Sequence, residues 1–371
     1  MRIVYVLNSL GMGGAERQAL AQAHRMAERG HTVAILVLRT RISEEWPTRL
    51  DTFYLNMRKT PFSFLKGLAQ ARRFLLEFKP DLLHSHSFHA NIVARLLKIL
   101  VPGTAVLSTV HNVYEGGRLR MLAYRLTDRL SRRTTAVCEA AAKRFVDLKA
   151  VPQHKCVVLA NGIETAEFAP DQARRALIRE QMGVNGNFIW MTAGRVVKAK
   201  DYPNLLRAFA RVLAADPDVE LWVAGASTDE ETRRLHDMSV IRGMGDSVRW
   251  LGLRRDLPAL LDAADGFVLG SAWEGMPLAV GEAMAMETPV VATDVGGTRE
   301  LVGDAGAVVP RKAPDALGMA MIELMQRTPE DRRKQGQVER QRICRNFNMD
   351  TKADEWETLY RTVLNGNLKG S

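Results

Sequence analysis

The chain opens with residues 3–17, IVYVLNSLGMGGAER, in which a short apolar run leads directly into a glycine-rich loop. A continuous apolar run of this length is typical of a strand buried on both faces of a parallel sheet. Glycines let the loop backbone approach an anion, and the amides at the start of the following helix then point toward it. The stretch therefore predicts the first strand, loop and helix of an α/β domain.

The alternation of strand and helix patterns continues along the chain and restarts once, after residue 165. Strands are expected at residues 3–7, 32–38, 82–84 and 105–110, then at 188–193, 220–224, 248–251, 266–269 and 289–292. Helices are expected at residues 203–214, 258–264 and 281–286, with a closing amphipathic helix at 349–364. This alternation predicts parallel sheets covered on both faces. We expect two doubly wound domains, residues 1–165 and 166–348, followed by a C-terminal segment, residues 349–371.

The length of 371 residues suits two domains, and a hydrophobic content of 46% can supply a core for each. No apolar run approaches the length of about 18 residues that a membrane-spanning helix needs. The N-terminus lacks the features of a signal peptide. The three cysteines lie far apart, which disfavours disulfides and a zinc site. These features predict a cytoplasmic protein without a bound metal or cofactor.

The positive charge of the chain is concentrated in its first half. Residues 1–165 hold 25 lysines and arginines against 12 aspartates and glutamates, whereas the whole chain has a net charge of +10. The first half thus carries the entire excess. This asymmetry predicts a polyanionic partner for that half, which could be a nucleic acid, an anionic membrane surface or phosphate groups.

Ligands of doubly wound sheets bind at the carboxyl ends of the strands, so the loops there are the candidate sites. In the first loop, Gly11, Gly13 and Gly14 could admit a phosphate, or could simply form a tight turn. The spacing differs from the dinucleotide fingerprint, because its third glycine would fall on Glu16. A dinucleotide-dependent dehydrogenase is therefore disfavoured.

Two loops of the second half carry charged residues after a strand. Residues 194–203, GRVVKAKDYP, place Arg195 and Lys200 before a helix, where they could clamp a diphosphate or remain solvated. Residues 274–285, EGMPLAVGEAMA, place Glu274 in a loop and Glu282 in the next helix. Carboxylates of this kind bind the hydroxyl pairs of a sugar or ribose. The alternative is a capping glutamate beside a partly buried one.

Four histidines cluster in the first half, at positions 84, 86, 89 and 111. A metal site is disfavoured, because no carboxylate or cysteine nearby has ligand spacing. We expect His111, at the end of a strand, to lie near a reacting sugar. The other three are expected to be structural or to contact the acceptor.

Together the three loops resemble the retaining nucleotide-sugar glycosyltransferases of family 4, and the resemblance covers nearly the whole chain. The matching segments are residues 13–17, Gly194-Arg195 with Lys200, the E-x7-E motif from Glu274 to Glu282, residues 295–301 and residues 161–163. The E-x7-E motif is the most specific of these. One departure is Asp201, since a glycine commonly follows the lysine in this family.

The resemblance implies the α/β fold called GT-B, in which two Rossmann-like domains face each other across a cleft and a C-terminal helix crosses back to the first domain. The second domain would bind an activated donor, a UDP-sugar, and the first domain a saccharide acceptor. Members need no metal, because protein cations replace it. Retention by front-face attack is the usual proposal for the family.

The resemblance also implies roles for individual residues. Arg195 and Lys200 would neutralise the leaving diphosphate, and Glu282 would hold the ribose hydroxyls. Glu274 would face the donor sugar, and His111 would lie near the primary hydroxyl of that sugar. Further donor contacts would come from Gly13, Gly14, Gly275, Met276, Pro277 and Leu278.

The basic first half contains two stretches with an amphipathic pattern, residues 62–79 and 116–133. In the second stretch, Arg118, Arg125, Arg129 and Arg132 are predicted to share one helical face, beside a stripe formed by Leu119, Leu122, Leu126 and Leu130. Such helices can lie on anionic lipid, although helices packed on their own sheet would look similar. The hypothesis is a peripheral membrane protein at the inner face of the cell membrane. Its acceptor would be a lipid-linked saccharide, as in the biosynthesis of lipopolysaccharide and other surface polysaccharides.

Other functions are alternatives to a glycosyltransferase. A nucleotide-sugar 2-epimerase or a glycogen-type synthase would share the fold, but an epimerase needs no basic acceptor domain. A non-enzymatic nucleotide-sugar sensor would not need Arg195, Lys200 and His111 together. Nucleic-acid binding is disfavoured, because the basic half lacks interleaved aromatic residues and any recognition-helix or RRM signature.

Overall fold

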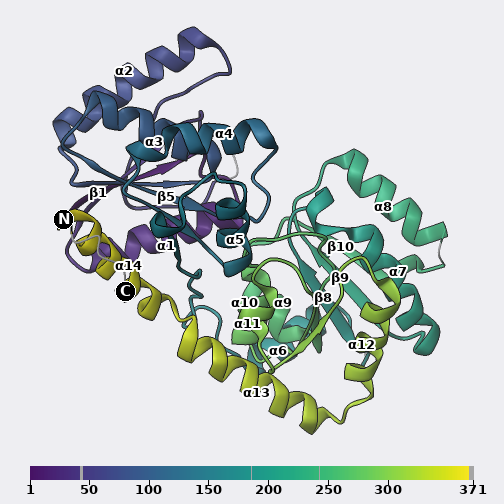
Figure 1. The fold of residues 1–371 in the computed structure, drawn as a ribbon. Helices are drawn as coiled ribbons and strands as arrows, with labels where there is room; N and C mark the ends of the chain where they lie inside the picture. Colours follow the sequence, from purple (N-terminus) through teal and green to yellow (C-terminus); the bar gives the residue numbers. More distant parts are fainter. Residues whose placement is uncertain (42–44, 185, 242, 367–371) are drawn as a thin grey trace. The chain divides into compact units, whose positions relative to one another are not determined.

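The computed structural model describes residues 1–41, 45–184, 186–241 and 243–366. The chain divides into two compact units. Unit 1 comprises Met1–Gly162 and the C-terminal segment that begins at Met349, and unit 2 comprises Ile163–Asn348. Each unit is a parallel sheet with helices on both faces (Figure 1). The predicted fold class, two Rossmann-like α/β domains, is confirmed.

Unit 1 is built on a seven-stranded sheet in the order β3-β2-β1-β4-β5-β6-β7, in which every neighbouring pair is parallel. The strands are β1 (Arg2–Leu7), β2 (Thr32–Val37), β3 (Asp51–Tyr54), β4 (Leu82–His86), β5 (Ala105–Val110), β6 (Arg133–Ala136) and β7 (Cys156–Val158). The helices are α1 (Gly14–Glu28), α2 (Pro61–Phe78), α3 (Phe88–Leu100), α4 (Arg118–Thr127), α5 (Glu139–Asp147) and α14 (Met349–Leu364), with short 3-10 helices η1 (Asp128–Leu130) and η2 (Gln153–Lys155).

Unit 2 is built on a six-stranded parallel sheet in the order β10-β9-β8-β11-β12-β13. The strands are β8 (Ile189–Ala193), β9 (Glu220–Ala224), β10 (Val248–Gly252), β11 (Gly266–Leu269), β12 (Val290–Thr293) and β13 (Ala307–Val309). The helices are α6 (Gln172–Gln181), α7 (Tyr202–Ala215), α8 (Asp229–Ile241), α9 (Leu257–Ala263), α10 (Leu278–Ala285), α11 (Thr298–Val302), α12 (Pro314–Gln326) and α13 (Pro329–Asn346), with 3-10 helices η3 (Lys198–Lys200) and η4 (Gly245–Ser247).

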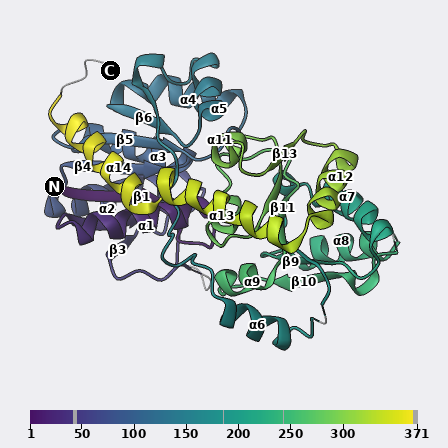
Figure 2. The same cartoon turned by 90° about the horizontal axis from the view of Figure 1, so that it is seen from below.

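The closing helix α14 packs against unit 1. Its apolar face, which includes Trp356 and Val363, joins the buried cluster formed by Ile3, Leu82 and Leu107 of the sheet. Figure 2 shows α14, in yellow, running along the strands β1, β4 and β5. Helix α14 also forms ion pairs with Arg25 of α1 and with Arg29, the residue that follows α1. The amphipathic pattern of residues 349–364 is thus used to complete the core of a unit that begins more than three hundred residues earlier.

The hydroxyl of Tyr360 anchors this helix through a buried polar network. It forms hydrogen bonds with the hydroxyl of Tyr5 at 2.9 Å and with Nδ1 of His84 at 2.7 Å, and it accepts one from Nε2 of Gln22 at 2.9 Å. Nε2 of His84 is in turn 2.7 Å from Oγ1 of Thr109. Burial lowers the pKa of His84 well below its usual value, so the ring is neutral at neutral pH. His84 therefore has a structural role in holding α14.

The end of α4 differs from the prediction. The helix stops at Thr127 and is followed by η1, so Arg129 and Arg132 do not share a helical face with Arg118 and Arg125. Asp128 is the first residue after the helix. Its carboxylate accepts a hydrogen bond of 2.9 Å from Nζ of Lys155, which also binds the backbone oxygens of residues 128 and 131.

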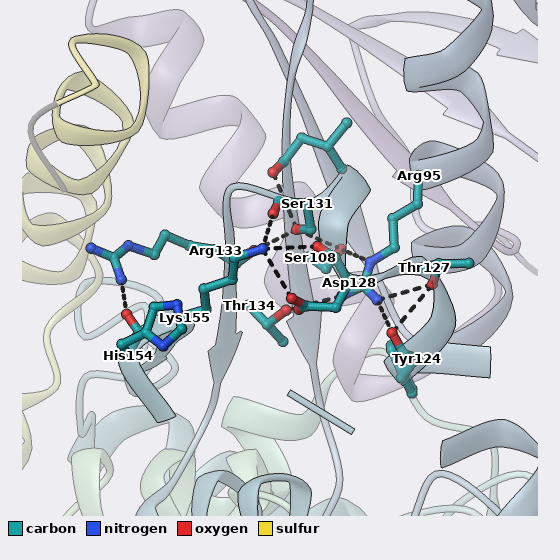
Figure 3. Close-up of polar contacts among 11 residues, drawn as sticks. Arg95, Ser108, Tyr124, Thr127, Asp128, Ser131, Arg133, Thr134, His154 and Lys155 are labelled. Carbon is teal, nitrogen blue, oxygen red and sulfur yellow. Dashed lines mark hydrogen bonds and ion pairs between the residues drawn. The ribbon is translucent and has the colours of Figure 1, made fainter. Parts of the chain in front are cut away.

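A second cation holds the same helix end from inside the unit. Arg95 of α3 is fully buried and donates from Nη1 to the backbone oxygen of Tyr124 at 3.0 Å and to Oγ1 of Thr127 at 3.2 Å. Its other nitrogens bind Ser108 of β5 and Thr134 of β6. Figure 3 shows how Arg95 and Lys155 converge on this turn from opposite sides. Positive charge at the last turn of a helix is stabilising, because the carbonyl oxygens there carry partial negative charge.

Candidate active site

The site residues of unit 2 gather where the sheet order reverses. In the order β9-β8-β11-β12, the chain proceeds outward in opposite directions from β8 and β11. This is the topological switch point, where ligands of open α/β sheets bind. The loop after β8 carries Arg195 and Lys200, and the loop after β11 carries Glu274.

The structure brings Lys200 and Glu274 together across this point. Nζ of Lys200 lies 2.8 Å from Oε1 of Glu274, and both side chains are largely shielded from solvent. The hydroxyl of Ser271 donates a 2.7 Å hydrogen bond to the same carboxylate oxygen. The backbone nitrogen of Ala272 donates to the backbone oxygen of Ala199 at 2.8 Å, which fixes the two loops to each other. The ammonium and the carboxylate are therefore held in one orientation.

Glycines allow the loops of the site to approach closely. Gly194 has a φ of +149°, and its carbonyl accepts a 2.7 Å hydrogen bond from the hydroxyl of Tyr202. A Cβ added to Gly225, after β9, would lie 1.9 Å from that carbonyl oxygen. Gly296, after β12, has a φ of +55°, and a Cβ there would lie 2.2 Å from the backbone oxygen of Gly275. Position 296 must therefore be glycine, because any Cβ there would clash with the backbone of Glu274 and Gly275.

Asp201 keeps the turn that a glycine usually makes. Its φ of 45° and ψ of 49° lie in the left-handed region, where glycine is favoured but aspartate and asparagine are tolerated. The residue is the N-cap of α7, and its backbone oxygen accepts from the nitrogens of Asn204 and Leu205. Aspartate thus occupies the left-handed position after Lys200, and Lys200 reaches Glu274.

Arg195 and Glu282 differ in their surroundings. The side chain of Arg195 is exposed and forms no hydrogen bond or ion pair with the residues that the structure describes. Glu282 lies one turn into α10 and is only 5% exposed. Met276, Pro277 and Leu278 form the entry to that helix, with Pro277 as its N-cap. These two loops and α10 thus bring to unit 2 the exposed guanidinium of Arg195, the buried carboxylate of Glu282 and a helix N-terminus.

The predicted residues of unit 1 also follow the carboxyl ends of strands. Gly13 is the N-cap of α1, with an extended backbone. A Cβ at this position would lie 2.3 Å from Oε2 of Glu16, so the Glu16 carboxylate lies against the start of the helix. Gly14 is the first residue of α1 and is exposed. The glycine loop therefore already has an acidic side chain beside it.

His111 follows β5 and forms a pair with His86. Nε2 of His111 lies 2.8 Å from Nδ1 of His86, whose own side chain is buried. Burial lowers the pKa of His111 to about 4. Burial also lowers the pKa of His86 well below its usual value, and the neighbouring His84 and His111 lower it further. Both rings are neutral at neutral pH, so His111 can exchange hydrogen bonds but carries no positive charge.

Glu115 is a further residue of this region that the sequence analysis did not single out. Its Oε1 accepts from the backbone nitrogen of His111 at 2.9 Å, and its Oε2 accepts from the hydroxyl of Tyr124 at 2.7 Å. Burial raises the pKa of Glu115 to about 7. A carboxylate four residues after a strand-end histidine is a visible signal, but only the fold shows that it shapes the His111 loop. In the part of the chain that is described, no group of three or more potential ligands forms a metal site.

Two family models match the chain. Residues 12–167 match Glycosyltransferase Family 4, and residues 187–327 match Glycosyl transferases group 1. The chain is 26% identical to UDP-Gal:alpha-D-GlcNAc-diphosphoundecaprenol alpha-1,3-galactosyltransferase of Escherichia coli over 313 residues, which cover 80% of this chain and 79% of that protein. It is 28% identical to D-inositol 3-phosphate glycosyltransferase of Corynebacterium aurimucosum over 310 residues, which cover 77% and 70% of the two chains.

Among solved structures, HepE of Anabaena in complex with UDP-glucose superposes with a TM-score of 0.85 at 19% identity. The superposition covers 97% of this chain and all of that chain. The likeness of folds extends over both units, and the two family models together cover most of the chain. The chain therefore belongs to the family 4 glycosyltransferases, has the GT-B fold and is a glycosyltransferase.

Proposed function

We propose that this enzyme transfers a sugar from a UDP-sugar to a lipid-linked saccharide, with retention of the anomeric configuration, in the biosynthesis of a surface polysaccharide. The observation that carries the proposal is the Lys200–Glu274 pair at the switch point of unit 2, beside the exposed guanidinium of Arg195. The relatives support the donor class, since one is named for UDP-galactose and a similar structure holds UDP-glucose. The former name also includes a diphosphoundecaprenol acceptor.

Sugar transfer from a UDP-sugar requires positive charge near the diphosphate, which is the leaving group. Cleavage of the bond between the anomeric carbon and the diphosphate leaves negative charge on the diphosphate and positive charge on the sugar. Arg195 and Lys200 would stabilise the diphosphate, and the amides around residues 276–278 would add partial positive charge. No protein carboxylates need to flank the anomeric carbon as they do in glycoside hydrolases. In front-face attack, the acceptor hydroxyl would give its proton to the departing phosphate oxygen.

The remaining residues would bind and orient the donor. The buried carboxylate of Glu282 would accept hydrogen bonds from both ribose hydroxyls, and Glu274 would face the donor sugar. His111, neutral at the working pH, would hydrogen-bond a sugar hydroxyl. Gly14 would allow the backbone to approach the diphosphate. Because Glu16 already lies against Gly13, we propose that the glycine loop contributes less to anion binding than Arg195 does.

A membrane location belongs to the same proposal. No helix in the described ranges has both the length and the apolar character to cross a bilayer. The outer face of α4 nevertheless exposes Leu119, Leu122 and Leu126 beside arginines. A peripheral position on anionic lipid would bring the enzyme to a lipid-linked acceptor.

The test is UDP release from a panel of UDP- and GDP-sugars, measured with and without a membrane lipid extract. We expect release from one UDP-sugar, stimulated by the extract, with the sugar recovered in the lipid phase as the α-anomer if the donor is α-linked. Conversion of the donor to its 2-epimer without transfer would favour the epimerase instead. Binding of UDP-sugars without any release, with every extract tried, would favour the sensor.

A further inference from the structure

A cavity of about 370 Å³ lies in unit 1 between α4, α5 and the loop that precedes α4. Its charged lining consists of Arg118 and Arg125 of α4 and Arg144 of α5. Its apolar lining consists of Met121, Leu122 and Leu148. The cavity is therefore amphipathic, because three arginines and three apolar residues line it.

The three arginines are not neutralised by the protein. None of them forms an ion pair with a carboxylate in the ranges that the structure describes, and Arg144 instead lies over the ring of Tyr114 at 5.5 Å. The nearby carboxylates have other partners. Asp147 pairs with Lys143, Asp128 with Lys155, and Glu115 accepts from Tyr124 and from the backbone of residue 111. Three guanidinium groups at one cavity attract a group with more than one negative charge.

The N-terminus of α4 adds to the positive charge at the cavity. Gly116 and Gly117 line the cavity, and Gly117 is the N-cap of the helix without any side-chain cap. No acidic residue stands in the first turn of α4. The partial positive charge of this helix N-terminus therefore adds to the charge of the arginines that line the cavity.

An apolar stripe continues from the cavity along the outer side of α4. Leu119, Leu122 and Leu126, spaced as on one helix face, are 82%, 47% and 72% exposed. The inner side of the helix is packed, since Met121 and Tyr124 are buried. Arg95 and Lys155 fix the far end of α4, as Figure 3 shows, so the stripe cannot turn inward without breaking these bonds.

We propose that this cavity binds the phosphate or diphosphate group of a lipid, whose hydrocarbon chain lies along Leu119, Leu122 and Leu126. The combination of clustered arginines and an adjoining apolar stripe matches an amphiphile better than a free phosphate or a hydrocarbon alone. The inference rests on the proposed function in one respect, because the lipid is taken to be the acceptor's carrier. It assigns the acceptor lipid to a site made only by unit 1.

The first test is binding of farnesyl diphosphate, a short and water-soluble lipid diphosphate, measured by calorimetry below its micellar concentration. The wild type is compared with R118A/R125A/R144A and with the control R72A/R73A, which removes two exposed charges from α2 outside the cavity. We expect the triple variant to bind at least 100-fold more weakly and the control to bind like the wild type. Equal binding by the wild type and the triple variant would overturn the proposal.

Two further ligands identify what the site recognises. Inorganic diphosphate and farnesol should each bind at least tenfold more weakly than farnesyl diphosphate. Equal affinity for inorganic diphosphate would mean a free-phosphate site and would refute the role of the lipid chain. L119S/L126S should weaken the binding of farnesyl diphosphate but not the binding of inorganic diphosphate.

Vesicles of phosphatidylcholine with phosphatidylglycerol test whether the arginines instead bind a general membrane surface. If the triple variant loses vesicle binding but still binds farnesyl diphosphate, the arginines serve only such a surface.

UDP binding separates this inference from the proposed function. The triple variant should bind UDP as the wild type does, because its substitutions lie in unit 1, whereas Lys200 and Glu274 belong to unit 2. If the wild type releases UDP from no sugar nucleotide but binds farnesyl diphosphate through the arginines, the proposed function fails and the lipid site stands. If turnover is found but the arginines do not affect lipid binding, the lipid site fails alone.

Discussion

Arg195 is an exposed cation in the loop after β8, and its removal tests the proposed diphosphate clamp. Arg195→Ala should lower kcat/KM for the UDP-sugar by about two to three orders of magnitude, because it removes positive charge from the developing diphosphate. Lys198→Ala removes another exposed cation of the same loop and should leave kcat/KM within about twofold of the wild type. Thermal unfolding of both variants checks the fold. Near-normal turnover of Arg195→Ala would refute the clamp.

Glu339 offers a test of pH dependence at the residue scale. It is fully buried in α13, accepts hydrogen bonds at Oε1 from Val290 and Gln335, and has no partner at Oε2 among the described residues. Burial raises its pKa from 4.5 to about 8. Because the folded state holds the proton of Glu339 more tightly than the unfolded state does, this carboxyl contributes its full stability below pH 4.5. The contribution is lost as the pH rises through about 8, where the buried carboxyl must ionise.

Glu339→Gln should therefore change how stability depends on pH. Between pH 5 and 8, the unfolding free energy of the wild type should fall relative to that of the variant by up to about 1.4 kcal/mol per pH unit. Urea unfolding at several pH values measures this difference. Parallel pH profiles of the two proteins would show that the carboxyl is not held in its neutral form.

At the scale of elements, the loop after β12 holds the loop that carries Glu274. Gly296→Ala places a Cβ against the backbone oxygens of residues 274 and 275, at a φ of +55°. Gly183→Ala is the matched control, since Gly183 has a φ of +66° but open space around its Cβ position. Gly296→Ala should destabilise the protein by about 1–3 kcal/mol more than the control and weaken UDP binding. Equal effects would mean that the close approach has no part in the site.

The sequence predicted most strands but not all of them, for physical reasons. Apolar strands such as β1 and β5 stand out because both faces are buried. Strand β6 was missed because it contains the polar residues Arg133, Thr134 and Thr135. The hydroxyls of Thr134 and Thr135 are paired inside the fold. The end of α4 was misplaced because it depends on Arg95 and Lys155, which are distant in the sequence.

For the site, the sequence predicted residues but not their partners. Lys200 and Glu274 were both singled out, yet their ion pair joins loops 74 positions apart and depends on the strand order. The support from Ser271 and the contact of Glu115 with the His111 loop were missed for the same reason. Local patterns identify loops at strand ends, whereas only topology decides which loops meet. The roles of these residues in the reaction remain predictions.

At the scale of the whole molecule, the chain's last helix completes its first unit. Tyr360→Phe would leave His84, Gln22 and Tyr5 without a shared buried partner. We expect a loss of about 1–3 kcal/mol of unfolding free energy. Thr358→Ala, at an exposed position of the same helix, should have little effect. Denaturant unfolding measures both, and an unchanged stability of Tyr360→Phe would contradict the anchoring role of the network.

We propose that unit 2 binds and cleaves a UDP-sugar through the predicted residues. The most direct measurement is the rate of UDP release from the preferred UDP-sugar by the wild type, by Glu282→Ala and by Glu323→Ala, an exposed glutamate of α12. We expect that release is lost in Glu282→Ala, together with UDP affinity, and is kept in Glu323→Ala. Unchanged release and UDP binding in a folded Glu282→Ala would contradict the assignment of the donor site.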